Sequence, residues 1–290
     1  MIEILSNYFR SVIVLSPSDL LPSIYLCLNQ VAPAFEGLEL GVAETNIMKA
    51  IAQTTGRSLQ QIKSDSQTTG DLGIVAEQTK SNQRMMFTPA AHTVQAMFTK
   101  LKGIAQMSGS TSMQKKVDTI KGIFVACRQS EARYFVRSLL GKLRIGLAEQ
   151  SVLQALGQSV TLTPPIENKE EPYNLNALAN RSDATIKQKC DETALIIKTV
   201  YCHCPDYNQI VAVLLEDGID SLKEKCQMKP GIPLKPMLAH PTKGIHEVLE
   251  RFDGIEFTSE WKYDGERAQI HLNEEGVISI YSRNQENNTS

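Results

Sequence analysis

A change of periodicity near residue 229 constrains the fold of this 290-residue chain more than any other feature. Before it, apolar residues recur at spacings of three and four, which is typical of amphipathic helices. Beyond about residue 255 they alternate with polar residues, which is typical of strands. Three prolines and a glycine in residues 229–236 prevent a helix from crossing this point. The sequence therefore predicts two domains, a mainly α domain over residues 1–228 and the beginning of an α+β domain over residues 229–290.

Capping residues mark the helices of the first domain. Ser16 and Asp19 resemble a capping box with a proline at the first helical position. Gly56 is placed to end one helix, and Ser58 with Gln61 to begin another. Residues 161–180 are rich in proline and asparagine and are expected to form a long exposed loop. We expect further helices over residues 20–28, 41–55, 94–107, 113–127, 131–140, 147–156, 183–201, 207–216 and 221–226.

The second part of the chain predicts a short helix followed by strands. We expect the helix over residues 245–252 and a first strand over residues 255–262. Residues 267–272 alternate strictly between polar and apolar, and a turn at residues 273–276 returns the chain as a hairpin partner over residues 277–282. Two or three strands do not make an independent domain. We therefore expect the second domain to be truncated here.

Composition limits the kinds of partner that this chain can bind. Lys and Arg number 30 against 32 Asp and Glu, giving a net charge of -2. Contact with a nucleic acid must therefore come from a local basic surface. No apolar run is long enough to span a membrane, and no signal peptide is evident. The six scattered cysteines suit reduced thiols, and Cys202 and Cys204 lack the usual zinc spacing, so no metal site is predicted.

A lysine motif carries the strongest chemical signal. Lys262, Asp264 and Gly265 form a K-x-D-G core, with Glu260 before it and Arg267 after it. In strand geometry Glu260 and Lys262 share a face, and Arg267 faces them if the hairpin folds back. A lysine whose pKa is lowered can attack phosphorus, while arginine and magnesium stabilise the charge that develops on the phosphate oxygens. An exposed Asp-Gly turn with solvated charges fits the same residues. The flanking Trp261 and Tyr263 are expected to pack in the core of the domain.

A short loop between two predicted helices is a candidate phosphate-binding site. It contains Gly141, Lys142, Leu143, Arg144 and Gly146. Glycines let a phosphate backbone approach closely, the two cations supply charge, and the N-terminus of the following helix attracts anions. Such contacts carry no sequence preference. An ordinary connector with two solvated cations is the alternative.

A second turn at a helix start is a weaker candidate of the same kind. Residues 108–112 are small and polar, and Ser110, Lys115 and Lys116 could hold a phosphate. A plain helix cap fits the same residues.

Several longer runs together resemble the eukaryotic ATP-dependent DNA ligases, and among them the replicative type. They are residues 70–77 (GDLGIVAE), 123–133 (IFVACRQSEAR), 141–151 (GKLRIGLAEQS), 230–240 (PGIPLKPMLAH), 262–271 (KYDGERAQIH) and 282–289 (SRNQENNT). The resemblance covers essentially the whole chain. It implies a helical DNA-binding domain followed by the start of a lysine-adenylylating nucleotidyltransferase domain.

The resemblance also implies roles for individual residues. Lys262 matches the lysine that takes AMP from ATP, and Glu260 matches the residue that reads the adenine amino group. Arg267 and Arg283 match arginines that contact the nucleotide or the phosphate of the nick. The loop from Gly141 to Gly146 is placed on the DNA minor groove. ATP and Mg²⁺ are the implied cofactors, although no metal ligand of the family lies in this part of the chain.

The expected function is sealing of nicks in duplex DNA through a lysyl-adenylate, in replication, repair and recombination. AMP would pass from Lys262 to the 5′-phosphate of the nick and leave when the 3′-hydroxyl attacks. The expected partners are nicked duplex DNA and replication and repair proteins, with no membrane. The expected location is the nucleus, with the mitochondrion as a second compartment. Because further motifs of the family are missing, we expect this chain alone not to seal nicks. An RNA ligase or capping guanylyltransferase, and a non-catalytic DNA-binding module, are the alternatives.

Overall fold

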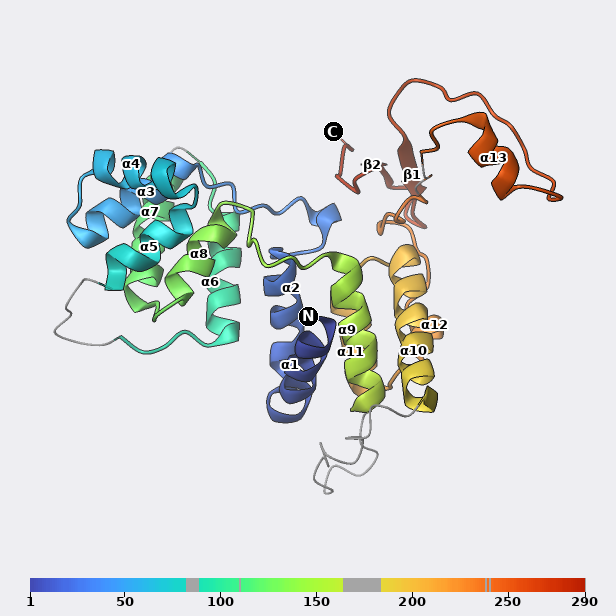
Figure 1. Cartoon of the computed structure of the whole chain (residues 1–290), viewed down its shortest axis with the longest axis horizontal. Coiled ribbons are helices and arrows are strands. Elements are labelled where there is room, and N and C mark those ends of the chain that lie inside the picture. The colour runs from blue at the N-terminus through green and yellow to red at the C-terminus, as the bar shows by residue number, and fades with distance from the viewer. Residues whose placement is uncertain (82–88, 110, 164–183, 238, 240, 290) are drawn as a thin grey trace.

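The structure, a computed structural model, describes residues 1–81, 89–109, 111–163, 184–237, 239 and 241–289 (Figure 1). Its helices form two groups, each around its own hydrophobic core. A small hairpin and one further helix follow these two groups (Figure 1). The prediction of a mainly α domain followed by the beginning of an α+β domain is confirmed. The exact boundary at residues 228 and 229 stays a prediction.

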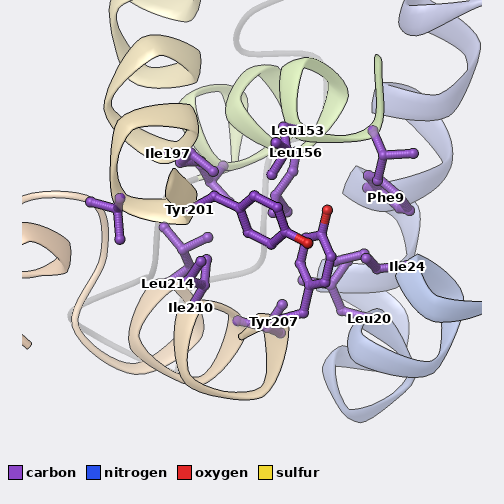
Figure 2. Packing of buried hydrophobic residues seen from close by; sticks show 14 of the residues in the cluster. Phe9, Leu20, Ile24, Leu153, Leu156, Ile197, Tyr201, Tyr207, Ile210 and Leu214 are labelled. Atoms are coloured by element: carbon purple, nitrogen blue, oxygen red, sulfur yellow. The ribbon is translucent and has the colours of Figure 1, made fainter. Parts of the chain in front are cut away.

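The first core is built by helices from both ends of the helical region. Apolar side chains such as Phe9, Leu156 and Ile197 are fully buried in it, and Tyr201 and Tyr207 pack against each other with ring centroids 4.6 Å apart (Figure 2). Burial of such surface is the main favourable contribution to folding. The helices of this group are α1 (Ile2–Leu15), α2 (Leu20–Leu28), α9 (Glu149–Leu162), α10 (Ala184–His203), α11 (Tyr207–Glu216) and α12 (Leu222–Lys225).

The second core belongs to the helices between α2 and α9. The predicted apolar face of residues 117–127 is buried in it, with Val117, Ile120, Phe124 and Cys127 each at most 5% exposed. Figure 1 shows this group beside the first one. Its helices are α3 (Glu44–Thr55), α4 (Leu59–Thr69), α5 (Leu72–Ser81), α6 (Val94–Gln106), α7 (Ser112–Ala126) and α8 (Glu131–Leu139). The helical region is therefore one inserted group of helices within another.

Most predicted helix ends are confirmed. Ser58 and Gln61 form a reciprocal capping box at the start of α4, with bonds of 3.2 and 3.1 Å. Gly56 ends α3 in the left-handed conformation, with φ of 71°. The box predicted at Ser16 is wrong, because its hydroxyl donates to the carboxylate of Asp19 and a 3₁₀ turn, η1 (Pro17–Asp19), precedes α2. A second 3₁₀ turn, η2 (Ala34–Glu36), follows α2.

Two predicted boundaries around α9 need correction. This helix begins at Glu149, two residues after the predicted start, and it continues to Leu162 because its last turns are buried in the first core. The loop predicted over residues 161–180 therefore does not begin at residue 161. Its remaining part, from residue 164 onward, lies outside the described residues.

The hairpin is confirmed, but its covered face is the polar one. Strands β1 (Ala268–Leu272) and β2 (Ile278–Ser282) pair antiparallel, with Ala268 opposite Ser282. Gln269 and His271 of β1 turn toward residues 231–234 and exchange hydrogen bonds of 2.7 to 3.0 Å with that backbone. Ile270 and Leu272 on the other face are 72% and 61% exposed. The alternation of polar and apolar residues thus predicted the strand correctly. Which face of the strand is covered depends on the segments that pack against the hairpin, here residues 231–234.

The strand predicted over residues 255–262 is wrong for the described structure. In the described chain these residues are exposed and belong to no strand or helix, and they follow helix α13 (Ile245–Arg251). A strand needs the backbone groups of a neighbour for its hydrogen bonds. Among the described residues β1 and β2 form a two-stranded sheet, and the one bridge outside this sheet joins Tyr281 and Asn287, so residues 255–262 have no strand partner.

Among the described helices, none is long and apolar enough to cross a membrane.

Candidate nucleotide and DNA-binding sites

A cleft of about 990 Å³, here called the hairpin cleft, separates the hairpin from the first helical group. Arg267 and Arg283 lie on the hairpin side of it, and Glu149, Tyr201 and Lys235 lie on the other. Two of the four residues predicted to bind the nucleotide therefore share one cleft, which has a third cation on its opposite wall.

The register of the hairpin brings the two arginines together. Ala268 pairs with Ser282, so Arg267 and Arg283 are opposite each other one position beyond the ladder. Both side chains are exposed. Two guanidinium groups at the same end of a hairpin repel each other. An anion bound between them offsets this repulsion and accepts hydrogen bonds from both. The arrangement suits a phosphate.

Glu149 occupies the start of α9 on the far wall of the hairpin cleft. Its carboxylate accepts a 2.6 Å hydrogen bond from Tyr201 Oη and pairs with Lys235 Nζ, which lies 4.9 Å from the centre of the Tyr201 ring. Burial, together with the charge of Glu149, raises the pKa of Tyr201, so its hydroxyl remains a donor. The helix whose N-terminus was predicted to bind DNA phosphate therefore carries an acidic residue in its first turn, and the carboxylate of that residue is paired with Tyr201 and Lys235.

The structure does not bring Glu260 and Lys262 into the hairpin cleft. Both side chains are exposed, in the segment without a ladder partner, and neither lines the cleft with Arg267. Trp261 and Tyr263 are 86% and 85% exposed, so the expectation that they pack in a core is wrong for the described residues. Their proposed packing needs further strands, which residues 255–289 do not supply. The roles of Glu260 and Lys262 stay predictions from the resemblance.

The predicted DNA-binding loop follows α8 and has an unusual backbone. Gly141, Arg144 and Gly146 are all left-handed, with φ of 77°, 55° and 67°. Glycine adopts this conformation freely, whereas an arginine does so only when its surroundings hold it there. Lys142 is exposed and Leu143 is half-buried. The loop therefore has a fixed shape with one lysine directed to solvent.

Asp71, just before α5, holds this loop in place. Its Oδ2 accepts hydrogen bonds of 3.0 and 2.6 Å from Arg137 and lies 3.5 Å from Arg144 Nη1, while its Oδ1 accepts from the Gly73 N–H at 2.8 Å. Arg144 also donates to the Gly70 carbonyl at 3.1 Å, and Arg137 to the Leu143 carbonyl at 3.4 Å. The side chains of Asp71 and Arg137 are only 5% and 12% exposed. This network connects α5, α8 and the loop.

Gly73 lets the network form. A Cβ at this position would lie 2.7 Å from the Arg133 carbonyl and 2.9 Å from Arg137 Cγ, which no real Cβ tolerates. Helix α5 therefore approaches α8 more closely than any other residue type would allow. Asp71 lies in the run 70–77 that carries the family resemblance, but no role was predicted for it, although an aspartate directly before a helix is a known cap and could have pointed to one.

Asp71 is expected to stabilise the protein near neutral pH. Burial tends to raise the pKa of Asp71, but hydrogen bonds from Arg137 and the Gly73 N–H hold it below its usual range. Asp71→Asn should therefore lower the free energy of unfolding by about 3 kcal/mol near pH 7, because it leaves the mostly buried Arg137 without its carboxylate.

The pH dependence follows from the depressed pKa of Asp71. Its contribution is complete above the unfolded-state pKa of about 3.9 and is lost as the pH falls through the lower folded-state value. Urea denaturation of wild type and Asp71→Asn should therefore give a difference in the free energy of unfolding that is constant from about pH 7 to pH 5 and narrows as the pH falls further toward the folded-state pKa. A difference that keeps its size below about pH 5 would contradict the proposed ionic contribution.

The second predicted phosphate site, at Ser110 and Lys115, stays a prediction. Lys115 is exposed on the first turn of α7 and does not line the cleft beside the Gly141–Gly146 loop. Lys116 is buried instead, and its Nζ donates to the carbonyls of Leu40 and Gly41 at 3.1 and 3.4 Å. Lys116 thus ties α7 to the segment that precedes α3. Ser110 lies outside the described residues.

A metal site would need several His, Cys, Asp or Glu side chains that lie close together. In the part of the chain that the structure describes, no group of three or more His, Cys, Asp or Glu side chains could hold a metal ion. Cys202 is exposed and Cys204 is buried, so these two thiols face different surroundings. The described residues therefore do not by themselves fit a magnesium site.

Comparison with known proteins decides the family. Residues 1–157 match the family described as "DNA ligase N terminus", and residues 236–290 match "ATP dependent DNA ligase domain". The chain belongs to the ATP-dependent DNA ligase family. It is 56% identical to DNA ligase 1 of Drosophila melanogaster over 290 residues, which is 100% of this chain and 37% of that protein.

Two fungal relatives agree with this assignment of the ligase chain. DNA ligase 1 of Schizosaccharomyces pombe is 45% identical over 286 residues, covering 99% of this chain and 36% of that protein. DNA ligase 1 of Saccharomyces cerevisiae is 43% identical over 289 residues, covering 99% and 37%. The chain thus spans little more than a third of the length of these relatives. The two matched regions follow the predicted order, a DNA ligase N-terminal part and then an ATP-dependent ligase domain.

Proposed function

We propose that this chain is the DNA-holding part and the start of the adenylylating domain of a ligase that seals nicks in duplex DNA with ATP. The observation that supports it best is the braced loop from Gly141 to Gly146, which presents Lys142 on a fixed backbone. A rigid loop of this kind contacts phosphates without reading bases, as an enzyme acting on any nick requires. Holding both ends of a nick in line is a contribution to catalysis through positioning.

The nucleotide would be bound by residues of the second domain. Arg267 and Arg283, opposite each other at the end of the hairpin, would hold a phosphate of ATP or of the nick. Lys262 would take the adenylyl group, and Glu260 would read the adenine. Because Lys262 is exposed and outside the hairpin cleft, this step requires Lys262 to come closer to the arginines than it lies here. We therefore assign complete turnover to the longer protein and not to this chain.

Magnesium would neutralise charge on the phosphates in such a reaction. The described residues do not supply a ligand set for it, so no step is assigned to a metal ion here. The complete ligase is proposed to act in the nucleus in replication, repair and recombination, with mitochondrial DNA as a second substrate. Imaging of the tagged complete protein would test its location, and exclusion from both compartments would contradict it.

DNA binding through the loop is tested by replacing Lys142, whose ammonium group has no hydrogen bond or ion pair with any described residue. Lys142→Ala should weaken binding to a nicked duplex and lower the slope of log affinity against log salt by about 0.9, as expected for one lost phosphate contact. Fluorescence anisotropy over a salt series measures both quantities. Arg144→Ala is unsuitable, because Arg144 also braces the loop through Gly70 and Asp71.

The matched control is Lys189→Ala, which removes an equally exposed lysine from α10. It should leave the affinity and the salt slope unchanged. Equal binding by wild type and Lys142→Ala would remove the loop from the DNA interface. A wild-type chain that fails to bind nicked duplex at low salt would contradict the proposed function itself.

A further inference from the structure

A second cleft, here called the loop cleft, lies between α4 and the Gly141–Gly146 loop. It has a volume of about 650 Å³ and is lined by Lys63, Ser66 and Gln67 on one side and by Lys142 and Arg144 on the other. This volume is within the range of ordinary ligand sites. The family resemblance predicted DNA binding for the loop side of this cleft, and no residue of α4 was predicted to bind DNA.

The α4 side of the loop cleft presents one lysine and two polar side chains. Residues 63, 66 and 67 are three and four positions apart on a helix, so they share a face. Lys63 is exposed, and its ammonium group has no hydrogen bond or ion pair with any residue of the described part of the chain. The same is true of Lys142 on the opposite wall. Two cations without partners therefore flank one cleft.

The charge of Asp71 in the loop cleft is already compensated by other residues of the protein. The cleft is lined by four cationic side chains, Lys63, Arg137, Lys142 and Arg144, and by two carboxylates, Glu44 and Asp71. Asp71 is saturated by Arg137, Arg144 and the Gly73 N–H. The four cations outnumber the two carboxylates, and the two lysines are the cations that Asp71 does not pair with. A concave surface with a surplus of one sign of charge attracts the opposite sign.

We propose that the loop cleft holds a backbone phosphate of the DNA duplex between Lys63 and Lys142, with Asp71 as the positioning residue that keeps the loop wall in place. This proposal rests on the proposed DNA binding and extends it from the loop to α4. The contact is to phosphate alone, so it is independent of base sequence. Ser66 and Gln67, one turn beyond Lys63, can donate hydrogen bonds to the same phosphate oxygens.

Replacement of Lys63 tests the proposal, because this exposed side chain can be removed without unfolding the helix. Lys63→Ala should lower the salt slope of binding to a nicked duplex by about 0.9 and the affinity roughly fivefold near 0.15 M salt. Lys189→Ala on α10 should change neither quantity. The double variant Lys63→Ala/Lys142→Ala should lower the slope more than either single variant does.

The outcomes separate this proposal from the proposed function. If Lys142→Ala weakens binding and Lys63→Ala does not, the α4 contact is overturned while DNA binding through the loop stands. If the wild type does not bind duplex at all, the proposed function fails first. Inorganic pyrophosphate, added as a competitor at the DNA phosphate concentration, distinguishes a site for free phosphate from one for the duplex. Loss of DNA binding at that concentration would overturn the proposal that the site is specific for phosphates of the duplex.

Asp71→Asn tests the positioning role through the direction of its effect. Removing a negative charge from a DNA-binding surface should strengthen binding if only charge matters. We expect weaker binding instead, severalfold, because the loop loses its brace. Asp118→Asn, at an exposed acid on α7, is the charge-matched control and should not weaken binding. Circular dichroism verifies that both variants are folded at the assay temperature, and Asp71→Asn binding as tightly as wild type would overturn the positioning role.

Discussion

In the ligase extended to the full length of its relatives, Lys262→Ala is expected to abolish covalent labelling of the protein by ATP labelled at the α-phosphate. An amine must attack the phosphorus, and the proposed function assigns this attack to Lys262. Labelling should fall to the background of the assay, the largest effect that we expect of any single substitution. Denaturing gel electrophoresis of the labelled protein measures it directly.

Two variants sharpen this experiment. Lys262→Arg keeps the positive charge but should also abolish labelling, because a guanidinium group is not deprotonated in proteins. Lys243→Ala, at another exposed lysine of the same region, should label as wild type does. Labelled protein after Lys262→Ala would overturn the assignment of the nucleophile. Transfer of label from GTP or NAD in place of ATP would favour a capping enzyme or another nucleotidyltransferase.

The second large effect is expected in the first hydrophobic core. Gly157→Ala should lower the free energy of unfolding by about 3 kcal/mol, toward the upper end for overpacked sites. A Cβ at Gly157 would lie 2.5 Å from Ala194 Cα and 2.8 Å from Ala194 N. These are backbone atoms of α10, so no side chain can rotate away and the two helices must move apart. Thermal denaturation should show a midpoint lower by roughly 10 °C.

Gly122→Ala is the matched control for this substitution. Gly122 also lies inside a helix, α7, but nothing is within 4 Å of the Cβ position there. Alanine is the better helix former, so this variant should be more stable by about 0.5 to 1 kcal/mol. The same change from glycine to alanine is therefore expected to lower the free energy of unfolding at Gly157 and to raise it at Gly122. A neutral Gly157→Ala would show that α9 and α10 are not in close contact in solution.

The local structure could be predicted well from local signals. The capping box of Ser58 and Gln61, the buried face of α7 and the hairpin at residues 268–282 all follow from residues close together in the chain. The start of α9 was misplaced by two residues, because Leu147 continues the apolar pattern while Glu149 is held by Lys235, far away in the sequence. Boundaries of this kind depend on tertiary contacts.

Some features of the candidate sites likewise follow from residues close together in the chain, and others from tertiary contacts. Contiguous runs of residues were enough to predict the family, the lysine motif around Lys262 and the loop with Lys142. The packed helices were needed to show that Arg144 is tied to Asp71, that Lys63 lies across a cleft from Lys142, and that Lys262 is apart from Arg267 and Arg283. The physical reason is that charge pairing and clefts depend on distances between residues far apart in the chain, and those distances exist only once the helices have packed.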